Sequence, residues 1–96
     1  MESSSDLENL RLKIDEIDDK IINFLIRRFK TVFKIGEYKK EHGKAIFQAS
    51  REEFIMGKVR KEAIKSEINP EALIKVYETI LEKSRDFQEK MRGNQQ

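Results

Sequence analysis

The chain has 96 residues, enough for one domain, and 40% of them are charged. Its 20 lysines and arginines against 18 aspartates and glutamates give a formal net charge of +2, and this near balance argues against nucleic acid as a partner. One histidine and no cysteine exclude disulfides and thiolate chemistry and leave no recognisable zinc site.

No apolar run approaches the roughly 20 residues that a membrane-spanning helix needs, and the first residues, MESSSD, do not resemble a signal peptide. We therefore expect a soluble, cytoplasmic protein that does not contact a membrane. A single domain over residues 1–96 is predicted, which leaves no room for a fused regulatory domain.

The first predicted element is one continuous helix over residues 6–42, which contains no proline and one glycine, Gly36. Ser5 followed three residues later by Glu8 is a capping-box signature at its start. Apolar residues recur at alternating three- and four-residue spacings, the pattern of a helix that packs along a neighbouring helix. They are Leu7, Leu10, Ile14, Ile17, Ile21, Phe24, Ile35 and Tyr38.

This helix is too long for the domain that it starts. About 35 residues at ~1.5 Å each span roughly 52 Å. A compact chain of this size has a diameter of only about 30–35 Å. The surplus apolar length needs a partner outside a single globule, and a homodimer provides one.

Three cations on this helix are candidates for a binding site. Arg28 stands where the heptad repeat predicts an apolar residue, and a guanidinium on an apolar face is costly unless an anion meets it. Lys39 lies about three turns further on and only about 20° around the helix, so both cations can face one pocket. Arg11 lies roughly 25 Å before Arg28 and about 100° off, too far to share that pocket in the same straight helix. An antiparallel partner helix could deliver Arg11 from a second subunit.

A second helix is predicted over residues 50–66. Gly43 is a plausible end for the first helix, because glycine readily adopts the left-handed conformation that ends helices. Ser50, followed by Glu53 three residues later, forms another capping-box signature.

The third predicted helix covers residues 70–91. Asn69 followed by Pro70 predicts its start, with a capping side chain and a proline at the first helical position. Residues 93–96 are expected to form a disordered tail. Because no strand pattern is present, the sequence predicts an all-α fold with three helices per chain.

Polar residues also interrupt the apolar faces of the shorter helices. They are Arg51 and Glu52 at the start of the second helix, and Ser84 and Gln88 on the third. Singly, each has a bland structural explanation, such as a solvated first turn or a small residue that eases helix packing. Together with the cations of the long helix they describe one cavity with several cations, one carboxylate and two neutral hydrogen-bonding groups. Such a cavity suits a small dianion that carries a hydroxyl.

These positions also carry a family resemblance, which extends from Leu7 to Gln88 in spacing as well as in residue type. The pattern is Leu10-Arg11-x-x-Ile14-Asp15-x-Ile17-Asp18, then Arg28, then Ile35-Gly36-x-x-Lys39, then Arg51-Glu52, then Ser84-x-x-x-Gln88. The chain resembles the all-helical chorismate mutases. This resemblance implies an intertwined all-α homodimer of three-helix chains, in which each of two active sites takes one arginine from the partner.

The resemblance implies roles for the residues that bind the substrate. Arg28 and the Arg11 side chain of the other subunit would hold the two carboxylates of chorismate, with Ser84 assisting. Glu52 would accept a hydrogen bond from the ring hydroxyl, and Arg51 would support the polar wall.

Lys39 and Gln88, with Arg28, are the implied catalytic residues. The reaction would be a Claisen-type rearrangement of chorismate to prephenate, an isomerase step of the shikimate pathway toward phenylalanine and tyrosine. Lys39 and Gln88 would donate hydrogen bonds to the ether oxygen, where negative charge grows as the C–O bond breaks. Clamping both carboxylates would hold the flexible side arm over the ring. No metal or other cofactor is expected, because the rearrangement is unimolecular.

The loop before the second helix departs from the family pattern. Gln48 stands where the family usually has an aspartate, so a second contact to the ring hydroxyl would come from an amide. Ala45 replaces a proline, which should loosen the loop slightly.

Two other functions remain open from the sequence. One is an isochorismate-pyruvate lyase on the same fold, which the presence of Arg51, Glu52 and Ser84 argues against. The other is a non-enzymatic helical interaction module, which predicts that Arg28, Lys39 and Gln88 can be changed without loss of function.

Overall fold

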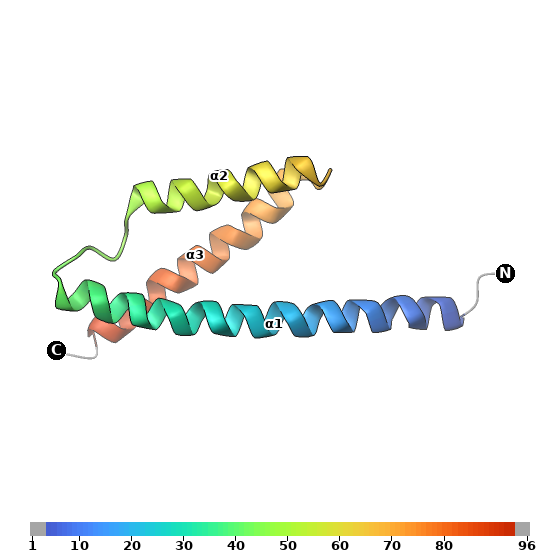
Figure 1. The fold of residues 1–96 in the computed structure, drawn as a ribbon, viewed down its shortest axis with the longest axis horizontal. Helices are drawn as coiled ribbons and strands as arrows, with labels where there is room; N and C mark the ends of the chain where they lie inside the picture. Colours follow the sequence, from blue (N-terminus) through green and yellow to red (C-terminus); the bar gives the residue numbers. More distant parts are fainter. Residues whose placement is uncertain (1–3, 94–96) are drawn as a thin grey trace. The chain divides into compact units, whose positions relative to one another are not determined.

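The computed structural model describes residues 4–93. Over that range it contains three α-helices and no strand, which confirms the predicted all-α fold of three helices (Figure 1). The helices are α1 (Ser4–Glu41), α2 (Ala49–Lys65) and α3 (Pro70–Gly93). Their ends lie within about two residues of the predicted ones, which is the usual uncertainty of helix ends. Gly93, predicted as part of a disordered tail, belongs to α3, and the rest of that tail lies outside the described residues.

The chain divides into two compact units, Met1–Thr31 and Val32–Gln96. The described residues of the first unit form the N-terminal part of α1. The second contains the last ten residues of α1, the loop that follows, and all of α2 and α3. The prediction that residues 1–96 form a single domain stays a prediction.

In the first unit, α1 begins at Ser4, and Ser5 therefore lies inside the first turn. The capping role of Ser5 stays a prediction, because the residues before Ser4 lie outside the described part of the chain. Asp6 also lies in the first turn, where its charge favours the positive end of the helix dipole. Among the described residues of this unit, nine large apolar side chains are exposed in the single chain. They are Leu7, Leu10, Leu12, Ile14, Ile17, Ile21, Ile22, Phe24 and Ile26.

The C-terminal end of α1 has the hydrogen bonds of a Schellman motif. The Lys44 N–H donates to the Lys39 carbonyl at 2.7 Å, and the Gly43 N–H donates to the Lys40 carbonyl at 3.3 Å. Gly43 has a φ of +63°, a left-handed conformation that glycine adopts without steric cost. The predicted helix end at Gly43 is confirmed.

The N-terminus of α2 differs from the prediction. Gln48 is the N-cap residue, with φ −128° and ψ 100°, and its side chain forms no cap hydrogen bond. Its backbone carbonyl accepts from the N–H groups of Arg51 and Glu52 at 3.1 and 3.2 Å. Ser50 lies within the helix, so its predicted capping role is wrong. The extended backbone at Gln48 starts the helix two residues earlier than the serine side chain suggested.

The connection between α2 and α3 is a second tight turn. Glu67 adopts a φ of 59°, and the Ile68 N–H donates to the Ala63 carbonyl at 2.9 Å. The Asn69 side-chain oxygen then accepts from the Glu71 N–H at 3.0 Å, one residue after Pro70. The predicted start of the third helix is confirmed.

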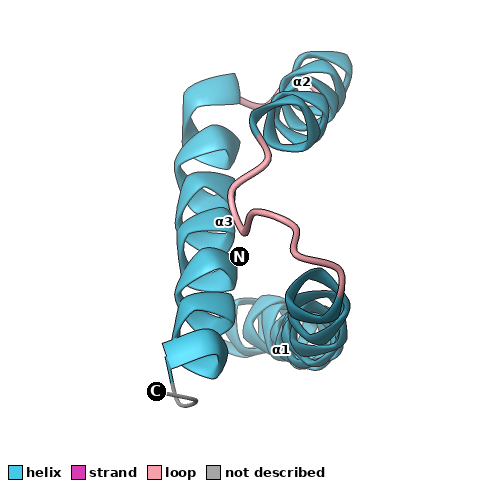
Figure 2. Ribbon diagram, turned by 90° about the vertical axis from the view of Figure 1, so that its left-hand side faces the viewer, coloured by secondary structure: helices cyan, strands magenta, loops and turns pink. Residues whose placement is uncertain are grey.

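In the second unit, α3 runs back along α2 in the opposite direction (Figure 1), and α2 and α3 contact each other directly. Figure 2 shows the loop that runs from the end of α1 to the start of α2. A small core holds the unit together through apolar burial. Its buried apolar residues are Val32, Ile46, Val59, Ala63, Ile74 and Leu81.

The end of α1 packs closely against α3 at a glycine. Gly36 is buried, and a β-carbon at this position would lie 2.5 Å from the Met91 Cε atom and 3.2 Å from Gln88 Cγ. Phe33 and Phe87 pack beside this contact with ring centroids 5.2 Å apart. None of the described helices has an uncharged apolar stretch long enough to span a bilayer.

Candidate functional site

A chain of hydrogen-bonded polar side chains connects α1 to α3 in the second unit. Lys39 Nζ donates to Gln88 Oε1 at 3.0 Å, and Gln88 Nε2 donates to the Ser84 carbonyl at 3.2 Å. Ser84 Oγ donates to the Ile80 carbonyl at 2.7 Å. Ser84 and Gln88 are each only 6% exposed, although both are polar. Three of the predicted site residues are thus brought together, and two of them are buried.

Lys39 also ties down the loop after α1. Its Nζ atom donates to the Ile46 carbonyl at 2.7 Å, and Ile46 is itself buried. Removal from water lowers the pKa of the Lys39 ammonium group from its ordinary value of 10.5, and the nearby Arg92 guanidinium lowers it further. The Glu52 carboxylate acts in the opposite direction and raises it. Lys39 is therefore a partly desolvated cation whose protonation depends on its neighbours.

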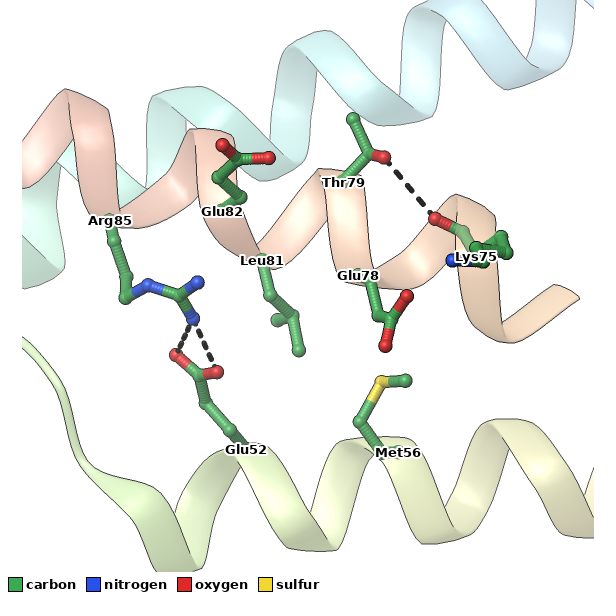
Figure 3. Close-up of a pocket in the computed structure, with 8 residues that line it drawn as sticks. All are labelled: Glu52, Met56, Lys75, Glu78, Thr79, Leu81, Glu82 and Arg85. Atoms are coloured by element: carbon green, nitrogen blue, oxygen red, sulfur yellow. Dashed lines mark hydrogen bonds and ion pairs between the residues drawn. The ribbon is translucent and has the colours of Figure 1, made fainter. Parts of the chain in front are cut away.

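Glu52, at the start of α2, faces Arg85 on α3. Arg85 Nη1 donates to both carboxylate oxygens of Glu52, at 2.5 and 2.6 Å, and Figure 3 shows the two side chains pointing toward each other. The Arg85 guanidinium also lies 5.7 Å from the ring centre of Phe47 in the preceding loop. The ion pair thus joins both helices and the loop.

This ion pair lies at one end of an open groove between α2 and α3, with a cavity volume of about 590 Å³. The groove is lined by Glu52, Met56, Lys75, Glu78, Thr79, Leu81, Glu82 and Arg85. In Figure 3, Met56 and Glu78 point toward each other across the groove, whereas Glu82 points away from α2. Its walls therefore combine apolar atoms with groups of both charges.

Two predicted site residues point elsewhere in this structure. The Gln48 side-chain amide donates to the Ala45 carbonyl at 3.3 Å, within the loop. Arg51 is exposed, and its guanidinium lies 5.2 Å from the ring centre of Phe54 on the same helix. Neither residue joins the Lys39 hydrogen-bond chain through these contacts.

The other two predicted residues, Arg11 and Arg28, belong to the first unit, whereas Lys39, Glu52 and Gln88 belong to the second. That Arg11 and Arg28 join the residues of the second unit in one site stays a prediction. Arg28 and Lys39 both belong to helix α1, as the prediction of their spacing along one helix assumed.

Sequence reasoning missed two residues around this site, Arg85 and Arg92. Arg92 Nη2 donates to the Lys44 carbonyl at 2.9 Å and so ties the same loop to the end of α3. Arg85 follows Leu81 by four residues and precedes Gln88 by three, so it lies on the inward face of α3. A cation on an apolar stripe is the signal that identified Arg28 and Lys39, and it could have identified Arg85 as well.

Over the described residues, no group of three or more His, Cys, Asp or Glu side chains is placed to hold a metal ion. The site instead combines an ammonium group, a guanidinium, a carboxylate and a primary amide. The ammonium, guanidinium and amide groups can bind an anion and donate hydrogen bonds to a developing negative charge, whereas the carboxylate can accept a hydrogen bond.

Comparison with known proteins identifies relatives over most of the chain. Residues 10–89 match the family model described as chorismate mutase type II. A protein of Methanocaldococcus jannaschii named chorismate mutase is 29% identical over 82 residues, which cover 85% of this chain and 83% of the relative.

Two further relatives carry different names. A bifunctional chorismate mutase/prephenate dehydratase of Buchnera aphidicola is 30% identical over 91 residues, which cover 95% of this chain and 24% of that protein. A 4-amino-4-deoxychorismate mutase of Streptomyces venezuelae is 24% identical over 81 residues, which cover 84% of this chain and 79% of the relative. The chain thus spans about a quarter of the Buchnera protein's length and most of the Streptomyces protein's length.

Proposed function

Because the chain belongs to the chorismate mutase type II family, we propose that it converts chorismate to prephenate, an isomerase step toward phenylalanine and tyrosine. In this rearrangement the ether C–O bond breaks, a C–C bond forms within the same molecule, and no atom is gained or lost. The ether oxygen gains negative charge as its bond to the ring breaks. Catalysis therefore requires donors aimed at that oxygen and a clamp on the rest of the substrate.

The observation that carries this proposal is the hydrogen bond between Lys39 and Gln88. An ammonium group has three N–H donors, and the bonds to Gln88 Oε1 and the Ile46 carbonyl use two of those of Lys39. The Gln88 amide has two N–H donors, and the bond to the Ser84 carbonyl uses one. Counting the bonds to described residues, one N–H on each side chain is left for a ligand oxygen.

The same bond fixes how the Gln88 amide is oriented. Because Oε1 accepts from Lys39, the amide nitrogen is the atom that faces other acceptors. Two donors held in place before the reaction stabilise the transition state without reorganising during it. The charge of Lys39 acts in a partly dry site, where electrostatic interactions are stronger than in water.

The clamp on the substrate carboxylates belongs to this proposal. Arg28 and Ser84 would bind from one chain, and Arg11 would come from the partner of a homodimer. Support for the homodimer comes from the exposed apolar side chains of the first unit, because soluble single chains rarely expose a continuous apolar stripe of this kind. A homodimer that buries this stripe would also remove it from water.

Incubation of the purified protein with chorismate tests the proposal. We expect chorismate to disappear and prephenate to be the product identified by nuclear magnetic resonance. Lys39→Ala should abolish most of this activity, whereas Lys40→Ala, at an exposed neighbour on the same helix, should retain it. Absence of turnover by the folded wild-type protein would refute the function.

Other substrates are tested in the same experiment. Isochorismate tests the lyase alternative, which would release pyruvate. 4-Amino-4-deoxychorismate is a second candidate substrate because of the name of the Streptomyces relative. A non-enzymatic helical module would convert none of the three, and a cytoplasmic location remains a prediction from the sequence.

A further inference from the structure

Arg85 forms an ion pair that none of the roles above uses. Its Nη1 atom donates to both oxygens of Glu52, and the two side chains are 34% and 22% exposed. Interactions between partly buried charges are less screened by salt than those on an open surface. Glu52 is the proposed acceptor for the ring hydroxyl, so Arg85 contacts a substrate-binding group directly.

The ion pair changes what Glu52 offers to a ligand. A carboxylate has about four lone-pair sites, and a single nitrogen between its oxygens leaves an outer site on each of them. A neutral hydroxyl can still donate to one of these sites. A cation gains less there, because the guanidinium offsets the carboxylate charge and repels a second positive charge nearby.

The two candidate substrates differ at this point. 4-Amino-4-deoxychorismate carries an amine in place of the ring hydroxyl, and aliphatic amines are largely protonated near neutral pH. We propose that Arg85 is a specificity-determining residue, which makes Glu52 selective for a neutral hydroxyl over an ammonium group on the substrate ring. This inference rests on the proposed function, because it assumes that Glu52 faces the ring substituent.

Arg85 also has a second contact, which gives it a structural role besides its ion pair with Glu52. Its guanidinium lies over Phe47, so its loss could loosen the loop before α2. A loosened loop would lower kcat/KM for both substrates by a similar factor. The ratio of kcat/KM for chorismate to kcat/KM for 4-amino-4-deoxychorismate, measured on one preparation, removes such common effects.

The experiment compares this ratio in the wild-type protein, Arg85→Gln and Arg85→Lys. We expect Arg85→Gln to lower the ratio by about tenfold or more, which corresponds to loss of one nearby charge interaction. Arg85→Lys keeps a cation and should keep the ratio within about threefold of wild type. Arg60→Gln is the matched control, because Arg60 forms an exposed ion pair with Glu71 at 3.5 Å, and it should leave the ratio unchanged.

A second arm asks whether Arg85 acts through Glu52. In a Glu52→Gln background, Arg85→Gln should change the relative binding of the two substrates by less than about twofold. Where 4-amino-4-deoxychorismate is turned over too slowly, its binding is measured as its inhibition constant in the reaction with chorismate. An unchanged ratio in Arg85→Gln, or an equal change in the Glu52→Gln background, would overturn the inference. Failure of the wild-type protein to convert chorismate would instead refute the proposed function.

Discussion

Gly36 on α1 lies so close to Gln88 on α3 that a β-carbon on the glycine would stand 3.2 Å from Gln88 Cγ. Gln88 is buried and hydrogen-bonded at both ends of its amide, so it has little freedom to retreat. The smallest residue of the helix is thus placed beside a proposed catalytic group. Its size helps to determine where the Gln88 amide lies.

We predict that Gly36→Ala reduces kcat by about tenfold, because misplacement of a catalytic donor by a fraction of an ångström weakens its contact in the transition state. Gly57→Ala is the matched control, since Gly57 lies in α2 and nothing within 4 Å would meet its added methyl group. That variant should keep its activity and gain about 0.5–1 kcal/mol in unfolding free energy from helix propensity.

The added methyl group would also meet Met91 Cε, at 2.5 Å. The end of a methionine side chain moves easily, so we expect this contact to matter less than the one with Gln88. Combining Gly36→Ala with Met91→Ala removes the contact between the added methyl group and Met91, and it should not restore kcat. Full recovery of kcat in the double variant would show that Met91, and not Gln88, transmits the effect.

Lys39→Ala is predicted to lower kcat by about 10²–10³-fold or more, because it removes the charged donor nearest the developing negative charge. Steady-state kinetics measure the loss, and circular dichroism checks that the helices remain. Lys40→Ala changes an exposed lysine one position further on and should behave like wild type. Turnover close to wild type in a well-folded Lys39→Ala protein would contradict the assigned mechanism.

Local sequence signals predicted the helices well where one residue determines the backbone. Asn69 and Pro70 start α3 as predicted, and Gly43 ends α1 with the left-handed conformation that glycine favours. Ser50 misled because a capping serine and a serine in the first turn look alike in sequence. The position of the helix start was decided by the extended backbone of Gln48.

The missed parts of the site depend on how α2 and α3 pack. Arg85 and Glu52 are 33 residues apart in sequence, and only the packing of the two helices brings them into contact. Gly36 could be recognised as the single glycine of the long helix, but its closeness to Gln88 depends on the packing of α1 against α3. Spacing along one helix identifies a face, but it does not identify the partner across it.

The pH dependence of kcat/KM should follow Lys39. Removal from water and the charge of Arg92 lower the pKa of its ammonium group below 10.5. Only the protonated form of Lys39 carries the charge that attracts the substrate dianion and the third N–H donor, so kcat/KM should fall as the pH rises through this lowered pKa. We therefore expect kcat/KM to be level near neutrality and to fall as the pH is raised further. The midpoint of this alkaline fall should lie at a pH lower than 10.5.

Arg92 offers a way to move this decline. Arg92→Gln removes a neighbouring positive charge, which should raise the pKa of Lys39 and shift the alkaline decline to higher pH. Arg92→Lys keeps the charge and should leave the profile near that of wild type. A shift to lower pH in Arg92→Gln would show that the decline belongs to another group.

Glu67→Gly is predicted to stabilise the fold. Glu67 has a φ of 59°, a left-handed conformation that costs a residue with a β-carbon about 1 kcal/mol relative to glycine. Thermal unfolding should therefore show a higher midpoint for this variant. Glu62→Gly, at an exposed position inside α2, should lower the midpoint, because glycine weakens helix interiors.

The last prediction tests whether Arg11 acts from the partner chain. Arg11 and Lys39 are about 28 residues apart, roughly 42 Å along an α-helix, so one chain should not place both in the same pocket. We expect Arg11→Ala and Lys39→Ala to be nearly inactive when each is prepared alone. Unfolding the two variants together and refolding them at equal ratio should make about half of the dimers mixed.

Each mixed dimer would have one site that lacks both side chains and one intact site. Roughly a quarter of wild-type activity should therefore return, given random pairing in a two-fold dimer. If Arg11 acted within its own chain, every site would keep one lesion and no activity would return. Native mass spectrometry must confirm that mixed dimers formed, because only then does a lack of recovered activity rule out an arginine donated by the partner.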